Sequence, residues 1–184
     1  MEPDGIYHVA PRGNDGRRIF LDDHDRRVYL ALLERVTRKY RWEVLGYCLM
    51  TNHTHLLVQV PDANLSQGMQ ELSSEYSRRW NRKHGHYGHL FQQRFPSRTV
   101  RSESHLIAAA RYIDLNPVVV RVKFRPEQWE WSSYRAHVGL VHPPPFLELA
   151  TFLPLFGPTP AKARAAYKAF VQEGRALVSD TGVV

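Results

Sequence analysis

The chain has few of the features that mark secreted or membrane proteins. Its 184 residues include one cysteine, Cys48, so no disulfide can form within the chain and a reducing compartment is expected. No apolar run approaches the roughly 18 residues of a membrane span. The first residues show neither the basic start nor the apolar segment of a signal peptide. These absences predict a cytoplasmic protein with no membrane partner.

Acidic residues are missing from one long segment. Residues 78–102 hold seven Lys and Arg but no Asp or Glu, and removing these seven from 25 basic residues leaves 18 against 18 acidic ones. The segment therefore carries the whole net charge of +7. Aromatic residues lie between its basic ones, as on surfaces that follow phosphates and stack bases. A solvated helix face is the alternative, but the complete absence of acids favours a polyanionic partner.

Apolar periodicity and turn residues predict alternating strands and helices. Strands are expected at 6–12, 42–50, 53–60 and 95–102, and helices at 22–39, 65–83 and 105–116. Ser102 or Ser104 is expected to cap the third helix, and Pro117 to stop it.

This order of elements is the α+β, ferredoxin-like β-α-β-β-α-β arrangement. It predicts an antiparallel sheet with two helices on one face, the other face open for a site, and the strand at 53–60 in a central position. A further helix follows the fourth strand. We assign residues 1–140 to this domain and residues 141–184 to a C-terminal extension with one short helix at 161–172. The last ten residues are expected to fray.

Two histidines stand two residues apart at the start of the strand predicted at 53–60. Strand side chains alternate between faces, so His53 and His55 point the same way with Cα atoms roughly 6.6 Å apart. Both rings can then reach one divalent ion. A structural pair of strand histidines is the alternative. A metal-dependent or histidine-based phosphoesterase is a further alternative. The next residues on that face are Leu57 and Gln59, so the alternating three-histidine pattern of nucleotide hydrolases is absent.

The helix predicted at 105–116 offers a further ligand and a nucleophile. Tyr112 and Asn116 are four residues apart, hence neighbours on one helical face. If this face lies over the sheet, Asn116 Oδ1 completes a His/His/Asn set, which suits Mg²⁺ or Mn²⁺. Tyr112 then lies close to a metal-bound phosphate. Tyr7, Tyr47 and Tyr76 are rival nucleophiles in principle. Tyr47 lies in an apolar strand and Tyr76 in the apolar stripe of a helix, which predicts structural roles for both.

Several separated segments resemble the REP-associated tyrosine transposases, relatives of the single-tyrosine HUH, IS200-like transposases. The matching segments are Leu-Met-Thr-Asn-His-Thr-His-Leu-Leu at 49–57, Gly-His-Leu-Phe-Gln-Gln-Arg at 88–94, Arg-Tyr-Ile-Asp-Leu-Asn-Pro at 111–117 and Trp-Ser-Ser-Tyr at 131–134. Arg-Gly-Asn at 12–14 and Ile-Phe at 19–20 extend the likeness over roughly residues 6–140. The chain departs from the family pattern at Thr54, where a large apolar residue is usual, and at Thr51, where proline is common.

The resemblance implies that His53 and His55 bind the metal, that Asn116 is the third ligand and that Tyr112 is the nucleophile. In the family's chemistry the metal polarises a phosphate of single-stranded DNA, and the tyrosine attacks phosphorus to leave a 5′-phosphotyrosine and a free 3′-hydroxyl. An unassisted phenol is a poor nucleophile at neutral pH, so it needs this help. Rejoining by a 3′-hydroxyl requires no nucleotide, and the chain has no Gly-rich phosphate loop.

The resemblance also implies the DNA partner. We expect a repeated extragenic palindrome (REP) that forms a hairpin beside a short single-stranded motif, a nucleoid-associated location, and a monomer, with a helix-exchanged dimer possible. The residues expected to contact DNA are Arg12, Asn14, Arg78, Arg79, Arg82, Lys83, Arg94, Arg98 and Arg101.

A non-catalytic, single-stranded nucleic-acid-binding domain of the same fold is the competing hypothesis. Such domains expose aromatic side chains on the open face of their central strands. Here the corresponding face of the strand at 53–60 carries histidine, leucine and glutamine instead. This composition favours a metal site over a stacking platform.

Overall fold

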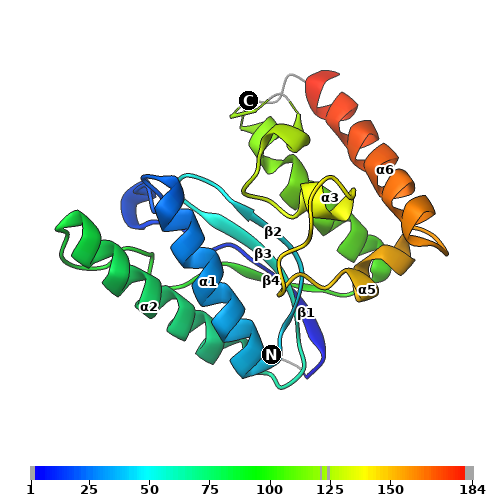
Figure 1. Cartoon of the computed structure of the whole chain (residues 1–184). Helices are drawn as coiled ribbons and strands as arrows, with labels where there is room; N and C mark the ends of the chain where they lie inside the picture. The colour runs from blue at the N-terminus through cyan, green and yellow to red at the C-terminus, as the bar shows by residue number, and fades with distance from the viewer. Residues whose placement is uncertain (1–2, 121, 124, 181–184) are drawn as a thin grey trace.

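Four strands and three long helices alternate through the first 120 residues (Figure 1). The computed structural model describes residues 3–120, 122–123 and 125–180, with side chains described as far as residue 176. The strands are β1 (Gly5–Val9), β2 (Glu43–Leu49), β3 (Thr54–Val60) and β4 (Ser97–Val100). The helices are α1 (Asp23–Tyr40), α2 (Leu65–His84) and α3 (Glu103–Val119). The predicted order is confirmed, with strands one to four residues shorter than expected.

The sheet has the order β2-β3-β1-β4, and every neighbouring pair is antiparallel. The strand with the paired histidines is therefore central, next to β1. His8 of β1 lies opposite Leu57 of β3, and His55 of β3 lies opposite Cys48 of β2. This topology confirms the ferredoxin-like prediction.

Helices α1 and α2 cover one face of the sheet (Figure 1). Asp22 caps α1 by accepting a hydrogen bond from the backbone N–H of Asp25. Helix α2 ends at Gly85, which adopts the left-handed conformation common after a helix. The apolar stripe of α2 is buried throughout and consists of Leu65, Met69, Leu72, Tyr76 and Trp80.

Helix α3 and the C-terminal part of the chain cover much of the opposite face, which was expected to be open. Leu45 and Leu57 point to this face from β2 and β3 and are fully buried together with Ile113 of α3. These side chains form a second apolar core, because burying them under α3 and the C-terminal part removes apolar surface from water. The open part of the face is reduced to the region around the histidines.

The predicted cap of α3 at Ser102 is confirmed, but the helix begins two residues earlier and ends three residues later than predicted. The helix starts at Glu103, after Ser102, whose hydroxyl accepts from the N–H of His105. It continues through Pro117 to Val119 instead of stopping at the proline. Pro117 lies in the last turn, where its missing N–H removes only one hydrogen bond. The turn is still closed by a hydrogen bond of 3.1 Å from the Val120 N–H to the Asn116 carbonyl.

The C-terminal extension holds more helix than the single short one predicted. It contains α5 (Leu149–Phe152) and α6 (Pro160–Asp180), and α6 packs against α3 (Figure 1). Ala163, Tyr167 and Val171 of α6 are buried at helical spacing, which explains why the helix persists. Residues 175–180 are helical rather than frayed, and 181–184 lie outside the described residues. The boundary at residue 140 stays a prediction.

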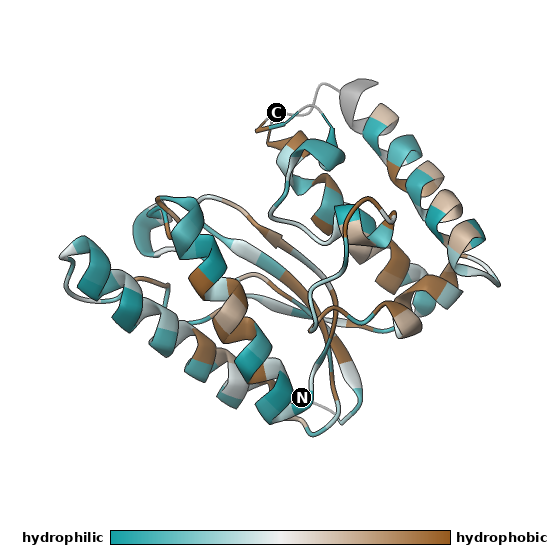
Figure 2. Ribbon diagram, in the orientation of Figure 1, coloured by the Kyte–Doolittle hydropathy of each residue, from teal (hydrophilic) through white to brown (hydrophobic). Residues whose placement is uncertain are grey.

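No helix within the described ranges is long and apolar enough to cross a membrane. Figure 2 shows the same property as helices that mix hydrophilic and hydrophobic residues along their length, with hydrophilic residues prevailing on α2.

Candidate active site between the central strands and helix α3

The paired histidines lie where the chain enters β3. His53 forms an isolated bridge with Arg12 just before the strand, and His55 is the second residue of β3. Their ring centroids are 4.8 Å apart. Thr54 points to the other face, where its hydroxyl lies 3.2 Å from the Tyr29 hydroxyl. The predicted alternation therefore brings both imidazoles to the side of α3.

Helix α3 brings Tyr112 and Asn116 to the same place. The ring of Tyr112 lies 5.6 Å from that of His55, and half of the tyrosine remains exposed to solvent. Asn116, one turn further along, is buried beside His53. The structure thus assembles the four residues that the sequence selected, while their roles stay predictions.

A third histidine, His8, joins the site and was missed in the sequence. Its Nε2 lies 2.9 Å from Nδ1 of His55, and its ring lies 5.8 Å from that of Tyr112. The signal was present, because Tyr7 and Val9 are apolar core residues and His8 between them must face the other way. To find His8 from the sequence, β1 has to be paired with β3, a pairing that the predicted ferredoxin-like topology already implies.

Two buried polar atoms in the site have no hydrogen-bond partner among the described residues. These are Nε2 of His55 and Oδ1 of Asn116. Asn116 lies close enough to His53 to affect its pKa, but it makes no hydrogen bond of ordinary geometry through Oδ1. Nδ1 of His53 lies 2.8 Å from Asn52 Oδ1, and this contact does not involve the other ring nitrogen, Nε2. Buried polar atoms without partners cost free energy and require an explanation such as a bound ion or water.

The donor set fits Mg²⁺ or Mn²⁺. Imidazole nitrogen and amide oxygen are both ligands of Mn²⁺, and Mg²⁺ accepts such a set with water. Within the described part of the chain no three His, Cys, Asp or Glu side chains are placed to hold a metal together. An ion at this site would therefore need the Asn116 amide or solvent beside His53 and His55.

Burial disfavours the protonated form of all three histidine rings. Burial lowers the pKa of His55 to about 3, helped by His53 and His8. Burial lowers the pKa of His8 to about 4, helped by Arg98 and His105. Burial also lowers the pKa of His53, against an opposing effect of Asn116. Neutral imidazole is the form that binds metal ions.

A cleft of about 360 Å³ opens in front of the site. Arg98 of β4 stands at its edge together with His105 and Tyr112 of α3, and His8 and His55 form part of its wall. A phosphate that entered the cleft would meet the tyrosine, the histidines and a guanidinium at once. This arrangement suits an anionic substrate.

The residues expected to contact DNA fall into two groups. The first group forms ion pairs within the fold. Arg78 and Arg79 pair with Glu75, and Lys83 pairs with Asp22 and Asp25. The acid-free segment of the sequence is therefore partly neutralised in space. Among the described residues, no ion pair forms at Arg12, Arg82, Arg94, Arg98 or Arg101. Asn14 begins a short 3-10 turn and contacts Asp15.

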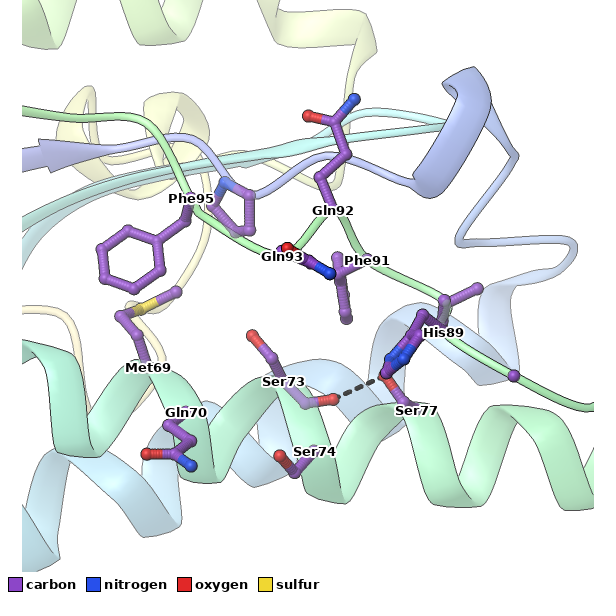
Figure 3. Close-up of a pocket in the computed structure, with 13 residues that line it drawn as sticks. Met69, Gln70, Ser73, Ser74, Ser77, His89, Phe91, Gln92, Gln93 and Phe95 are labelled. Carbon is purple, nitrogen blue, oxygen red and sulfur yellow. Dashed lines mark hydrogen bonds between the residues drawn. The ribbon is translucent and has the colours of Figure 1, made fainter.

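A second hollow, of about 520 Å³, lies between helix α2 and residues 88–95 (Figure 3). Hydroxyl and amide side chains of α2 form one wall, and aromatic rings line the other. None of its described lining residues is Asp, Glu, Lys or Arg. Pro11 and Phe95 line this hollow while their neighbours Ala10 and Pro96 line the cleft at Tyr112, so the two adjoin.

Comparison with known proteins identifies the class to which this architecture belongs. The family model described as "Transposase IS200 like" matches residues 4–116, more than half of the chain, and its match ends at Asn116. The chain belongs to the IS200-like transposases, which are DNA-processing enzymes. Within this family it is similar to the REP-associated tyrosine transposases.

Two known proteins carry this similarity. A Haemophilus influenzae protein assigned as a REP-associated tyrosine transposase is 23% identical over 145 residues, which cover 73% of this chain and 82% of that protein. The solved structure of a REP-associated tyrosine transposase bound to a REP hairpin has a TM-score of 0.66 at 17% identity. The match covers 80% of this chain and 87% of that one, and it shows a shared fold.

Proposed function

We propose that this protein nicks and rejoins single-stranded DNA in a metal-dependent reaction, with Tyr112 as the nucleophile. His53, His55 and Asn116 would hold Mg²⁺ or Mn²⁺. The observation that carries the proposal is the pair of unpartnered buried atoms, Nε2 of His55 and Oδ1 of Asn116, beside a half-exposed tyrosine. Such atoms are costly unless a ligand uses them.

The chain's own groups have distinct tasks in this reaction. When bound, the ion would neutralise charge on the scissile phosphate and polarise it. Tyr112 Oη forms a bond to phosphorus as the bond to the 3′-oxygen breaks, which leaves a 5′-phosphotyrosine. The phenolic proton passes to solvent at the open side of the ring, and the departing 3′-oxygen takes a proton there. Attack by a 3′-hydroxyl on the phosphotyrosine reverses both changes and rejoins the strand.

The surroundings of the site suit a single DNA strand. Arg12 lies near His53, and Arg98 lines the cleft, so we expect both to contact phosphates of the bound strand. The related structure holds a REP hairpin, and we propose that a palindromic hairpin with an adjoining single strand is also the partner of this chain. We propose that a monomer suffices, because all four site residues come from one chain.

Covalent capture tests the nucleophile. The protein is incubated with Mn²⁺ and labelled hairpin oligonucleotides carrying a single-stranded flank, and the products are run on a denaturing gel. Wild-type protein should shift with the label, whereas Tyr112→Phe should bind DNA in a native gel but give no covalent band. Tyr87→Phe is the matched control, since Tyr87 is 91% exposed outside the site and should leave the band unchanged. A covalent band that persists in Tyr112→Phe would refute the assignment.

Chelation and ligand variants test the metal. Excess EDTA and His53→Ala should each abolish the covalent band, and added Mn²⁺ should restore it only in the wild type. Cleavage that continued in EDTA would overturn the metal proposal. Binding without any covalent product in the wild type, over a panel of hairpins and divalent ions, would favour the non-catalytic alternative.

A further inference from the structure

We propose that His8 is a positioning residue that holds His55 in the tautomer and orientation able to bind a metal ion. The inference rests on the proposed metal site and adds a residue to it. Nε2 of His8 lies 2.9 Å from Nδ1 of His55, a distance at which one ring must donate a hydrogen bond to the other. His55 is only 5% exposed, so water cannot readily replace this partner.

The direction of this hydrogen bond decides whether His55 can be a ligand. A neutral imidazole carries one N–H and one lone pair. If His55 donates from Nδ1, its Nε2 keeps a lone pair that faces the site. If His8 donates instead, the proton of His55 must lie on Nε2, and that nitrogen cannot bind a metal. Metal binding therefore requires His8 to accept at Nε2 and to carry its own proton on Nδ1.

The two central strands fix this contact. His8 is paired with Leu57, so it is the diagonal neighbour of His55 across the β1–β3 ladder and on the same face. His8 also lines the open cleft, where solvent can accept from its other ring nitrogen. Metal-bound histidines usually donate their second ring N–H to a fixed acceptor, and loss of that acceptor typically costs about 10- to 100-fold in metal affinity.

Variants of His8 separate positioning from general electrostatics. The affinity for Mn²⁺ is measured from the free-ion signal by electron paramagnetic resonance. His8→Ala should weaken binding about 10- to 100-fold, and His8→Gln, whose amide oxygen can accept from Nδ1–H, should restore most of it. His142→Ala is the matched control, because His142 is exposed, contacts the Pro143 carbonyl and does not line the cleft, so it should change affinity less than twofold.

A second measurement reads the tautomer directly in the metal-free protein. Two-bond ¹H–¹⁵N correlations of histidine-labelled protein should show His55 protonated on Nδ1 in the wild type and in His8→Gln, and a mixture or the Nε2–H form in His8→Ala. An Nε2–H form in the wild type, or equal Mn²⁺ affinity in His8→Ala and wild type, would overturn the inference. A wild type that bound no Mn²⁺ would instead remove the metal site, while the tautomer measurement would still decide the role of His8.

Discussion

One polar side chain of the site lowers the stability of the free protein. Oδ1 of Asn116 is buried without a hydrogen bond of ordinary geometry to any described residue, and an acceptor in that state costs roughly 1–3 kcal/mol. An apolar residue of similar shape would avoid this cost. Asn116 is therefore a residue at which stability and metal binding should respond in opposite directions.

Replacing Asn116 by leucine tests this opposition. Without metal, Asn116→Leu should leave the free energy of unfolding unchanged or raise it by about 1 kcal/mol, because the unsatisfied oxygen disappears. Wild type should gain about 2.7 kcal/mol at a Mn²⁺ concentration of 100 times Kd, and the variant should gain almost nothing. Urea unfolding with Mn²⁺ and with EDTA measures both values. A full Mn²⁺-dependent gain in the variant would remove Asn116 from the ligand set.

Single residues were identified from the sequence where local spacing decides their neighbours. His53 with His55 and Tyr112 with Asn116 follow from strand and helix periodicity, and the fold brings these pairs together. His8 was missed because its contact depends on pairing across strands. Lys83 was counted as a free cation because nothing local shows that Asp22, 61 positions away, lies 2.7 Å from it.

At the level of elements, α3 is anchored through a buried carboxylate. Asp114 lies on the helix face opposite Tyr112 and is fully buried. Its oxygens lie 2.6 Å from the Tyr167 hydroxyl of α6, 3.2 Å from His137 Nδ1 and 3.2 Å from the Ser133 hydroxyl. Two segments that follow α3 in the chain, residues 133–137 and helix α6, thus converge on Asp114. Together they hold α3, which carries Tyr112, in its place in the fold.

The hydroxyl of Tyr167 should contribute measurably to this anchoring. Tyr167→Phe removes a hydrogen bond to a carboxylate and should lower the free energy of unfolding by roughly 1.5–3 kcal/mol. Tyr134→Phe is the matched control, because Tyr134 is equally buried but its hydroxyl has no partner among the described residues, and it should be neutral or slightly stabilising. Urea denaturation compares the two. Equal losses in both variants would show that the hydrogen bond to Asp114 contributes nothing.

A second carboxylate links the start of α1 to the end of α2. Burial opposes ionisation of Asp25, but hydrogen bonds from Lys83, the Leu21 N–H and His84 outweigh it, so the pKa of Asp25 is lowered. Its contribution to stability is therefore complete above the unfolded-state pKa of about 3.9 and is lost as the pH falls through the lower folded-state value. The ionised Asp25 carboxylate should therefore raise the free energy of unfolding at neutral pH and lose this effect in acid.

Asp25→Asn tests this link. At pH 7 the variant should be about 2 kcal/mol less stable than the wild type, a typical value for hydrogen bonds to a charged group. The difference should stay constant down to about pH 4 and shrink below it as the wild-type carboxylate takes up a proton. Thermal unfolding of both proteins between pH 2 and pH 7 measures the difference. A gap that widened in acid would contradict the assigned direction of the pKa shift.

The order of elements was predictable because each has a strong local signal, such as the Asp22 cap of α1 and the glycine after α2. The C-terminal end of α3 and the length of α6 were not. Pro117 normally stops a helix, yet here it lies within the last turn, where one lost hydrogen bond is tolerable. Residues of α6 remain helical because Tyr167 and Val171 pack against the rest of the fold, a contact that no local pattern reveals.

At the scale of the whole molecule, the two hollows and three of the unpaired arginines lie toward one end of the sheet. The cleft at Tyr112 is lined by Ala10 and Pro96, and the hollow beside α2 is lined by their neighbours Pro11 and Phe95. The hollow has hydroxyl, amide and aromatic groups but no charged lining residue, which suits a base rather than a phosphate. Arg12, Arg94 and Arg98, without ion pairs, belong to the segments that form this end. A single strand could then pass from the tyrosine around the sheet end.

The salt dependence of DNA binding distinguishes arginines that meet phosphates from those already paired. Each phosphate contact to a single strand contributes about 0.7 to the slope of log K against log salt concentration. Arg98→Ala should therefore weaken binding of a single-stranded oligonucleotide and reduce the slope by about 0.7. Arg78→Ala is the matched control from the same acid-free segment, and its existing pair with Glu75 predicts a smaller change in both quantities. Fluorescence anisotropy titrations between low and moderate salt give the slopes. An equal loss of slope in both variants would mean that the whole segment acts as a diffuse basic surface, without the path from Tyr112 around the sheet end.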